Sequence, residues 1–339
     1  MRWRRGLLVA AVATVGITAC QVPGSTNPAM HYTLPATSSA SPVAQPSLSP
    51  HPGVTTAPSV DAVITAPLLF AASRDGRTTY LLGTLHRGVD ATHQLPPWVW
   101  HYFNTATALV MEADANDPAL QRAMVRSDGS TLRNELGDAT WHRLERALGA
   151  DAAYQLNDLP VPMATMAIAL TGLPETQAMD ATLAAAADVL HKPIMFLEPM
   201  TVQVRLATKW LDASALTSML DDFALVPQRN RELLVAYLHG ELSGLTQVVS
   251  DGRSDFARSG RPVGQYDTMM TELLGQRNRM WVPVVEQLHR AGLGIAANER
   301  TLGAGPTFIA VGALHLTGPD GLLALLNRRG FIVTQLKQP

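Results

Sequence analysis

The stretch TYLLGTLHRG, residues 79–88, runs from an apolar segment into Gly83-Thr84-Leu85-His86. Much later the chain repeats the pattern, because FIAVGALHLTG, residues 308–318, contains Gly312-Ala313-Leu314-His315. Short continuous apolar runs are typical of strands that are buried on both faces. We therefore interpret the two copies as equivalent strand ends in one α/β body, each followed by a histidine.

Three further apolar runs indicate strands, and helical patterns lie between them. Strands are expected at 78–82, 107–111, 193–197, 307–311 and 331–335. Helices are expected at 138–149, capped by Asp138 and Gly149, and at 180–192 and 320–329. Strands that alternate with helices predict a mostly parallel central sheet with flanking helices. The helical pattern of 200–291 predicts a long helical insertion, at about 200–292.

Composition limits the function. The 339 residues are 47% hydrophobic and 16% charged, enough to bury one large core or two smaller ones. The net charge of −2 offers no basic field for nucleic acid, so this class of partner is set aside. The sequence also lacks an HExxH helix, a P-loop and a GxSxG elbow.

The first twenty residues indicate a targeting segment. A basic start precedes an apolar run at 7–17, which is short for a membrane span, and small residues then lead to Cys20. This end resembles a bacterial lipobox, which implies a lipoprotein signal peptide over 1–20 and a lipid anchor on Cys20. An ordinary secretory signal with an incidental cysteine is the alternative. The residue after Cys20 is Gln21 rather than an aspartate. By the same resemblance, this favours anchoring in the outer membrane, with the folded domain on the periplasmic side.

The segment that follows is not expected to fold. Residues 21–66 are rich in Pro, Ser, Thr and Ala and have few large apolar side chains, so they predict a disordered tether. The folded domain is expected over 67–339.

The strand ends deliver side chains that can do chemistry. His86, Glu112, Glu198 and His315 each follow a predicted strand, and Asp114 comes soon after Glu112. Ligands of parallel sheets bind beyond the carboxyl ends of the strands, so these side chains would share one rim. Two histidines with two or three carboxylates suit a divalent metal.

Each of these residues also has a structural interpretation. A lone histidine after a strand can be a hydrogen-bonded turn residue, Glu112 can cap a helix, and Glu198 can be a solvated loop residue. Asp180 is a further candidate catalytic residue; it precedes an Ala-rich helix, so its structural interpretation is that of an N-cap. His142 and His289 have charged neighbours in helical patterns and are expected on the surface.

Several motifs, in order, resemble the TraB/GumN family, which includes the Tiki metalloproteases and is similar to ChaN-like and erythromycin-esterase-like proteins. The matching segments are Leu82 to His86, Leu95-Pro96-Pro97, Ala108 to Asp114, Ala178-Met179-Asp180, Phe196-Leu197-Glu198 with Gln203, Arg277-Asn278-Arg279-Met280 and Val311 to Gly321. The resemblance covers about 66–337. One departure is Pro199, where many members have threonine.

The resemblance implies an α/β core with paired Gly-x-x-His motifs and an acidic site residue. It implies His86, Glu112 and His315 as the site, with Arg277 and Asn278 as possible partners. Tiki members are membrane-tethered peptidases that depend on a divalent metal such as manganese or cobalt. The resemblance therefore implies the same activity here, with zinc as a further possible metal.

Three functions follow as hypotheses. The leading one is a lipid-anchored hydrolase acting on peptides or proteins, in which His86, Glu112 and His315 hold a metal and a bound water attacks a carbonyl. Glu112 or Glu198 would act as general base, and Arg277 would neutralise the oxyanion. The second is a metal-free hydrolase that uses His86 as base with Glu112. The third is an envelope lipoprotein that binds haem or another ligand through its histidines.

Overall fold

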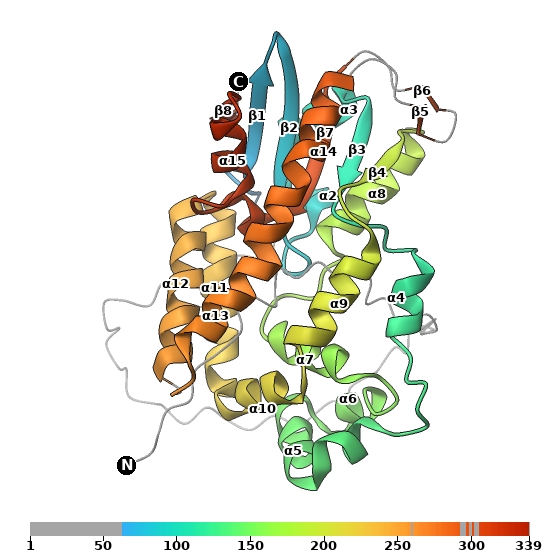
Figure 1. The fold of residues 1–339 in the computed structure, drawn as a ribbon, viewed down its shortest axis with the longest axis vertical. Coiled ribbons are helices and arrows are strands. Elements are labelled where there is room, and N and C mark those ends of the chain that lie inside the picture. The colour runs from blue at the N-terminus through green and yellow to red at the C-terminus, as the bar shows by residue number, and fades with distance from the viewer. Residues whose placement is uncertain (1–62, 259, 292–295, 298–299, 302–304, 339) are drawn as a thin grey trace, which may run out of the picture.

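A six-stranded sheet in the order β4-β3-β7-β2-β1-β8 forms the upper part of the molecule as drawn in Figure 1. The computed structural model describes residues 63–338, except 259, 292–295, 298–299 and 302–304. The strands are β1 (Leu69–Arg74), β2 (Arg77–Thr84), β3 (Ala108–Met111), β4 (Ile194–Phe196), β7 (Thr307–Gly312) and β8 (Ile332–Gln335). Every residue of β7 is buried, as its continuous apolar run predicts.

The sheet is mixed but mostly parallel. β4, β3, β7 and β2 run side by side in parallel, whereas β1 is antiparallel to both β2 and β8. This confirms the predicted fold class. β1 was not expected, although Asp75-Gly76 was its signal. Both residues have positive φ, 52° and 71°, as the tight turn of a β-hairpin requires.

Helices occupy most of the remaining described chain. Before β4 lie α2 (Ala91–Gln94), α3 (Pro97–Thr105), α4 (Pro118–Ala123), α5 (Leu132–Leu148), α6 (Ala150–Gln155), α7 (Val161–Ala169) and α8 (Met179–Val189). Between β4 and β7 lie α9 (Met200–Trp210), α10 (Ala213–Asp221), η1 (Phe223–Leu225), α11 (Val226–Leu238), α12 (Leu242–Arg258), α13 (Val263–Met270), η2 (Thr271–Gln276), α14 (Arg277–Ala291) and the short pair β5 (Ala296–Ala297) and β6 (Arg300–Thr301). η3 (Ala313–Leu316) and α15 (Leu322–Arg328) follow β7.

The helix predicted at 138–149 is the second part of a longer element, which a non-helical residue divides just before Asp138. The helix expected to start at Asp138 is part of α5, which Thr131 caps by accepting from the backbone N–H of Asn134. Gly137, at a φ of 72°, kinks α5 just before Asp138. Gly149 follows its end, as predicted.

Both faces of the sheet are covered by helices. Successive residues of a strand point to opposite faces, and β2 shows this clearly. Thr79 bonds His289 of α14, with Oγ1 and Nδ1 3.0 Å apart, while the ring of Tyr80 packs on Tyr102 of α3. His142 is exposed as expected, but the expectation for His289 was wrong. It is 4% exposed, because α14 lies against the sheet and β2 supplies its partner.

The apolar side chains form two clusters. One surrounds the sheet and includes Phe308, Leu183 and Val285. The other fills the helical part of the molecule, drawn below the sheet in Figure 1, and includes Trp141 and Met219. The polar side chains considered below lie at the edge of the sheet that faces this helical part.

The predicted signal peptide, Cys20 and nearly all of the predicted tether lie outside the described residues. Within the described part, no helix is long and apolar enough to cross a membrane. Ile64 and Ala66, at the end of the predicted tether, are already packed in the fold. Ile64 is buried, and its N–H donates to the carbonyl of Gln94.

The contact between Gly240 and Ala66 can test how closely the first described residues pack against the helices. Gly240 has a φ of 67°, and a Cβ there would overlap the carbonyl oxygen of Ala66. Gly129 has the same φ of 67° with no atom within 4 Å of such a Cβ. We expect Gly240→Ala to lower the free energy of unfolding by about 2 kcal/mol more than Gly129→Ala. Both substitutions place an alanine at positive φ, but only the one at Gly240 also makes its Cβ overlap with Ala66. Chemical denaturation of both variants measures this; equal losses would contradict the close packing.

Candidate active site

Four parallel strands end at the same edge of the sheet, and each is followed by one of the predicted site residues. His86 follows β2, Glu112 follows β3, Glu198 follows β4, and His315 lies in the turn after β7. Glu112 and Glu198 are 5% and 7% exposed, and His315 is fully buried. The strand ends therefore place the predicted residues on a common rim, beneath the helices.

The two glycines of the repeated motif have different physical roles. Gly83 pairs with Val311 in the parallel register, and a Cβ on it would lie 2.9 Å from Leu316 Cδ1. Glycine is needed there because β2 packs directly against the turn of the second motif. Gly312 instead donates its backbone N–H to Glu112 Oε1 at 2.8 Å. The two motifs thus touch each other.

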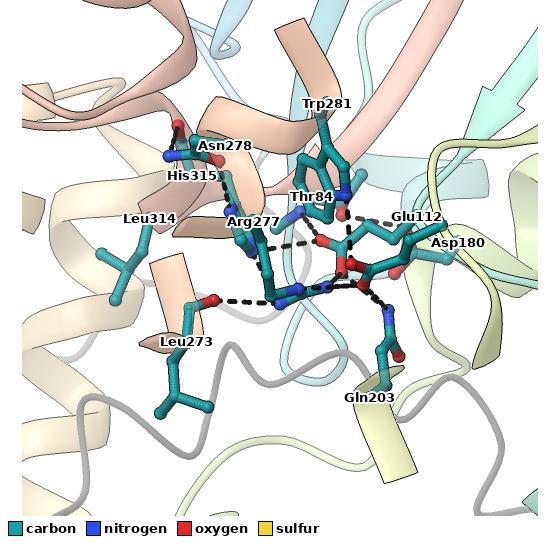
Figure 2. Close-up of polar contacts among 12 residues, drawn as sticks. Thr84, Glu112, Asp180, Gln203, Leu273, Arg277, Asn278, Trp281, Leu314 and His315 are labelled. Carbon is teal, nitrogen blue, oxygen red and sulfur yellow. Dashed lines mark hydrogen bonds and ion pairs between the residues drawn. The ribbon is translucent and has the colours of Figure 1, made fainter. Parts of the chain in front are cut away.

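Arg277 lies at the centre of the site (Figure 2). Its Nη2 donates to Glu112 Oε2 at 2.6 Å and to Glu198 Oε1 at 2.5 Å, and its Nε donates to Glu198 Oε1 at 2.9 Å. Its Nη1 contacts the carbonyl oxygen of Leu273 and Nε2 of His315, both at 3.1 Å. A guanidinium has five N–H donors, so these five contacts use all of them.

The charge of Arg277 is held in place by its partners. Burial alone would lower the pKa of Arg277, but the charges of Glu112 and Glu198 outweigh it and raise the pKa. The guanidinium therefore stays charged and neutralises one of two buried carboxylates. Because it has no donor left, the structure gives no support to the predicted oxyanion role of Arg277.

Arg277 comes from an unusual part of the helical insertion. It follows η2, a turn of π-helix, and begins α14. Such turns are rare and are frequent at functional sites, because they change which way the following side chains point. Four residues later, on the same face of α14, the Trp281 Nε1–H donates to Glu198 Oε2 at 3.1 Å. Its ring lies 4.6 Å from the guanidinium carbon and 4.5 Å from the centre of the His315 ring.

Gln203 of α9 links the two carboxylates. Its Nε2 donates to Glu112 Oε2 and to Glu198 Oε1, both at 3.2 Å. Both oxygens of each carboxylate therefore accept hydrogen bonds from the protein. A general base needs an oxygen that can take a proton from water, so this arrangement favours a structural role for Glu112 and Glu198 over the predicted catalytic one.

His315 is held as a neutral imidazole. Its Nδ1 lies 2.7 Å from Asn278 Oδ1, and the amide nitrogen of Asn278 donates to the carbonyls of His315 and Asp320. This assignment places the proton on Nδ1 and turns the lone pair of Nε2 toward Arg277. Burial, the charge of Arg277 and the proximity of His86 lower the pKa of His315 well below its usual value.

His86 is in a different environment from His315. Its Nδ1 lies 3.0 Å from Asp180 Oδ2, at ion-pair distance, and Thr84 donates to Asp180 Oδ1 at 2.9 Å. Burial would lower the pKa of His86, but Asp180 and then Glu112 outweigh it and raise the pKa. Among the described residues, neither ring nitrogen has a partner in hydrogen-bonding geometry, and the side chain is 11% exposed.

Asp180 is not the N-cap of its helix. It lies in the first turn of α8, after Ala178 at the N-cap position, and its carboxylate is buried beside His86. The Thr84 hydroxyl and the Trp281 indole were missed from the sequence. Their positions in the sequence could have indicated them. Thr84 lies inside the first motif, and Trp281 lies one helical turn after Arg277, on the same face of the helix.

The three predicted metal ligands do not form one ligand set in this arrangement. In the described part of the chain, no three His, Cys, Asp or Glu side chains are placed to hold a metal ion. His315 directs its lone pair to Arg277, and Glu112 accepts from a backbone amide, Gln203 and Arg277. Among the described residues, Nδ1 of His86 faces Asp180 and Nε2 has no hydrogen-bond partner. The metal assignment therefore stays a prediction.

The buried neutral state of His315 makes stability depend on pH. Its pKa is lower in the folded chain than the ordinary 6.5, so below pH 6.5 the unfolded chain binds more protons and stability falls as pH falls. The expected loss is about 1.4 kcal/mol per pH unit for one such group. His86 adds little slope well below pH 6.5, because its raised pKa keeps it protonated in the folded chain and the unfolded chain is protonated there as well.

We expect His315→Gln to reduce the dependence of unfolding free energy on pH, between pH 6.5 and about 5, by about 1.4 kcal/mol per unit. His289, whose pKa burial also lowers, would keep part of the slope. Urea denaturation across this range measures the slopes. A slope in His315→Gln equal to that of the wild type would contradict the neutral assignment.

Comparison with known proteins identifies the family of this chain. No curated protein and no solved structure gave a significant match. The family model described as the TraB/PrgY/gumN family matches residues 68–335, which contain all six strands of the central sheet and every residue of the site. The chain therefore belongs to the TraB/PrgY/gumN family.

Proposed function

We propose that this chain is a hydrolase with peptides as its substrates, in which His86 takes the proton from an attacking water. The observation that carries the proposal is the pairing of His86 with Asp180. Asp180 is itself held by Thr84 and lies 3.0 Å from Nδ1 of His86, whereas Nε2 of the imidazole has no hydrogen-bond partner among the described residues. A base oriented by a carboxylate, with a nitrogen left for the reaction, is the arrangement that proton abstraction requires.

The proton can be followed through the reaction. A water O–H bond breaks, its proton moves to His86, and the oxygen attacks the carbonyl carbon of the peptide. The carbonyl π electrons move to its oxygen; when they return, the C–N bond breaks and the imidazolium gives its proton to the departing amine nitrogen. Asp180 and Glu112 favour the charged imidazolium, since both raise the pKa of His86. Glu112, Glu198 and Arg277 together carry one net negative charge, which supports the same step.

The exposed fractions of the side chains suggest which of them a substrate can contact. Arg277 is 1% exposed and His315 is fully buried, whereas the His86 side chain is 11% exposed. A substrate would therefore meet His86 before the other site residues. Arg277, Glu112 and Glu198 would not contact the substrate. Their role would be structural, and their charges would act on His86.

A metal-assisted version of the same hydrolase is the second candidate. His86 Nδ1 and Nε2, Asp180 Oδ2 and Gln203 Oε1 are buried, and within the described residues they have no hydrogen-bond partner. These are nitrogen and oxygen donors of the kind that manganese, cobalt or zinc accepts. The metal would then be held on the His86 and Asp180 side of the site rather than by His315.

The envelope location and the ligand-binding alternative rest on the sequence. A lipid anchor at Cys20 would place the hydrolase at the bacterial envelope, with its domain on the periplasmic side of the outer membrane. For haem binding, His315 is poorly suited, because its Nε2 faces Arg277 at 3.1 Å. Hydrolysis is therefore the function that we propose.

The proposal predicts that hydrolysis of a fluorogenic peptide library depends on His86. His86→Ala should lower the rate roughly 10²- to 10⁴-fold, the usual contribution of a general base. His93→Ala is the matched control, because His93 also pairs with an aspartate, Asp90, but is exposed. A His86→Ala variant as active as His93→Ala would contradict the proposal.

The pH profile gives a second readout. The base must be neutral, so the rate should rise with pH through the raised pKa of His86. Asp180→Asn removes the group that raises this pKa, so the rising limb should move to lower pH while the maximum rate falls. Activity that survives EDTA supports metal-free hydrolysis, and activity lost in EDTA but restored by Mn²⁺ supports the metal-assisted version.

A further inference from the structure

The cation that neutralises the buried carboxylates belongs to the chain itself. We propose that Arg277 takes the place of a divalent cation between Glu112, Glu198 and His315, and that removing its guanidinium turns these three side chains into a metal site. The proposal concerns binding and does not depend on the hydrolytic activity.

Three side chains from different strand ends converge on one guanidinium. The contacts are 2.6 Å to Glu112, 2.5 Å to Glu198 and 3.1 Å to His315 (Figure 2). Two carboxylates and one imidazole are a donor set that manganese, cobalt and zinc accept, with bonds of about 2.0–2.2 Å. With Arg277 in place, no three such side chains of the described residues are arranged to hold an ion, so these three would have to close around it once the guanidinium is gone.

The guanidinium and a metal ion exclude each other at this position. Arg277 uses the lone pair of His315 Nε2 and contacts one oxygen of each carboxylate. A divalent cation a few ångströms from it would also be repelled strongly, since two positive charges interact at close range in a poorly solvated site.

The side chains that would become ligands are held by partners other than Arg277. A backbone amide, that of Gly312, holds Glu112, and Trp281 holds Glu198. Asn278 binds His315 Nδ1 and thereby keeps Nε2 as the nitrogen with the lone pair, which is the tautomer that binds metals. These contacts remain when the guanidinium is removed, so the set would stay oriented.

The test is a titration of metal-stripped protein with Mn²⁺, followed by calorimetry and by thermal unfolding. Arg277→Ala should bind one Mn²⁺ at least 100-fold more tightly than the wild type, and Mn²⁺ should raise its Tm. Arg277→Lys keeps the charge and should not gain this site. Arg253→Ala removes an exposed arginine from its carboxylate partner Asp267 and should also gain none.

A second substitution identifies the ligands. Adding His315→Gln to Arg277→Ala should weaken Mn²⁺ binding at least tenfold. If Arg277→Ala does not fold alone, Mn²⁺ should restore its folding; failure to fold even with Mn²⁺ overturns the proposal. So does a folded Arg277→Ala that binds no more tightly than the wild type.

The wild type provides an independent measurement. Mn²⁺ binding that weakens tenfold in His315→Gln would show a metal beside Arg277 and overturn the proposal. Wild-type binding that depends on His86 but not on His315, or no binding at all, agrees with it. None of these readings uses peptide cleavage, so failure of the proposed function and failure of this inference are distinguishable.

Discussion

Two carboxylates buried side by side constrain the whole site. Placing even one ionised carboxylate in a poorly solvated interior costs several kcal/mol, and two together repel each other. Arg277 resolves this for Glu112 and Glu198 with three N–H contacts, and its other two N–H groups bind the carbonyl of Leu273 and the ring of His315. The ends of β3 and β4, the π-helical turn and the start of α14 must therefore keep their relative positions.

The same constraint explains why two Gly-x-Leu-His motifs produce two different histidines. His315 faces a neutral amide and a guanidinium, so its pKa falls and it stays neutral. His86 faces Asp180 and the field of Glu112, so its pKa rises. Spacing in the sequence is equal in the two motifs, but the charges supplied by other parts of the chain are opposite.

Much of the fold was predictable because burial leaves a local signature. Continuous apolar runs located β2, β3, β4, β7 and β8, and their alternation with helices gave the parallel arrangement. β1 was missed because its run, LFAASR, ends in polar residues, although the Asp75-Gly76 turn marked it. His289 was misplaced because its charged neighbours suggested solvent, whereas Thr79 and the carbonyl of Arg74 bind it.

The sequence by itself determined which residues stand at the strand ends, and hence that His86, Glu112, Glu198 and His315 share one rim. It did so because strand direction and the position of a residue after a strand are local properties. Tertiary structure alone decided that Arg277 lies between the carboxylates, that Asp180 pairs with His86, and which imidazole is neutral. These depend on contacts between segments as far apart as Glu112 and Arg277, 165 positions along the chain, and on charges that no local pattern records.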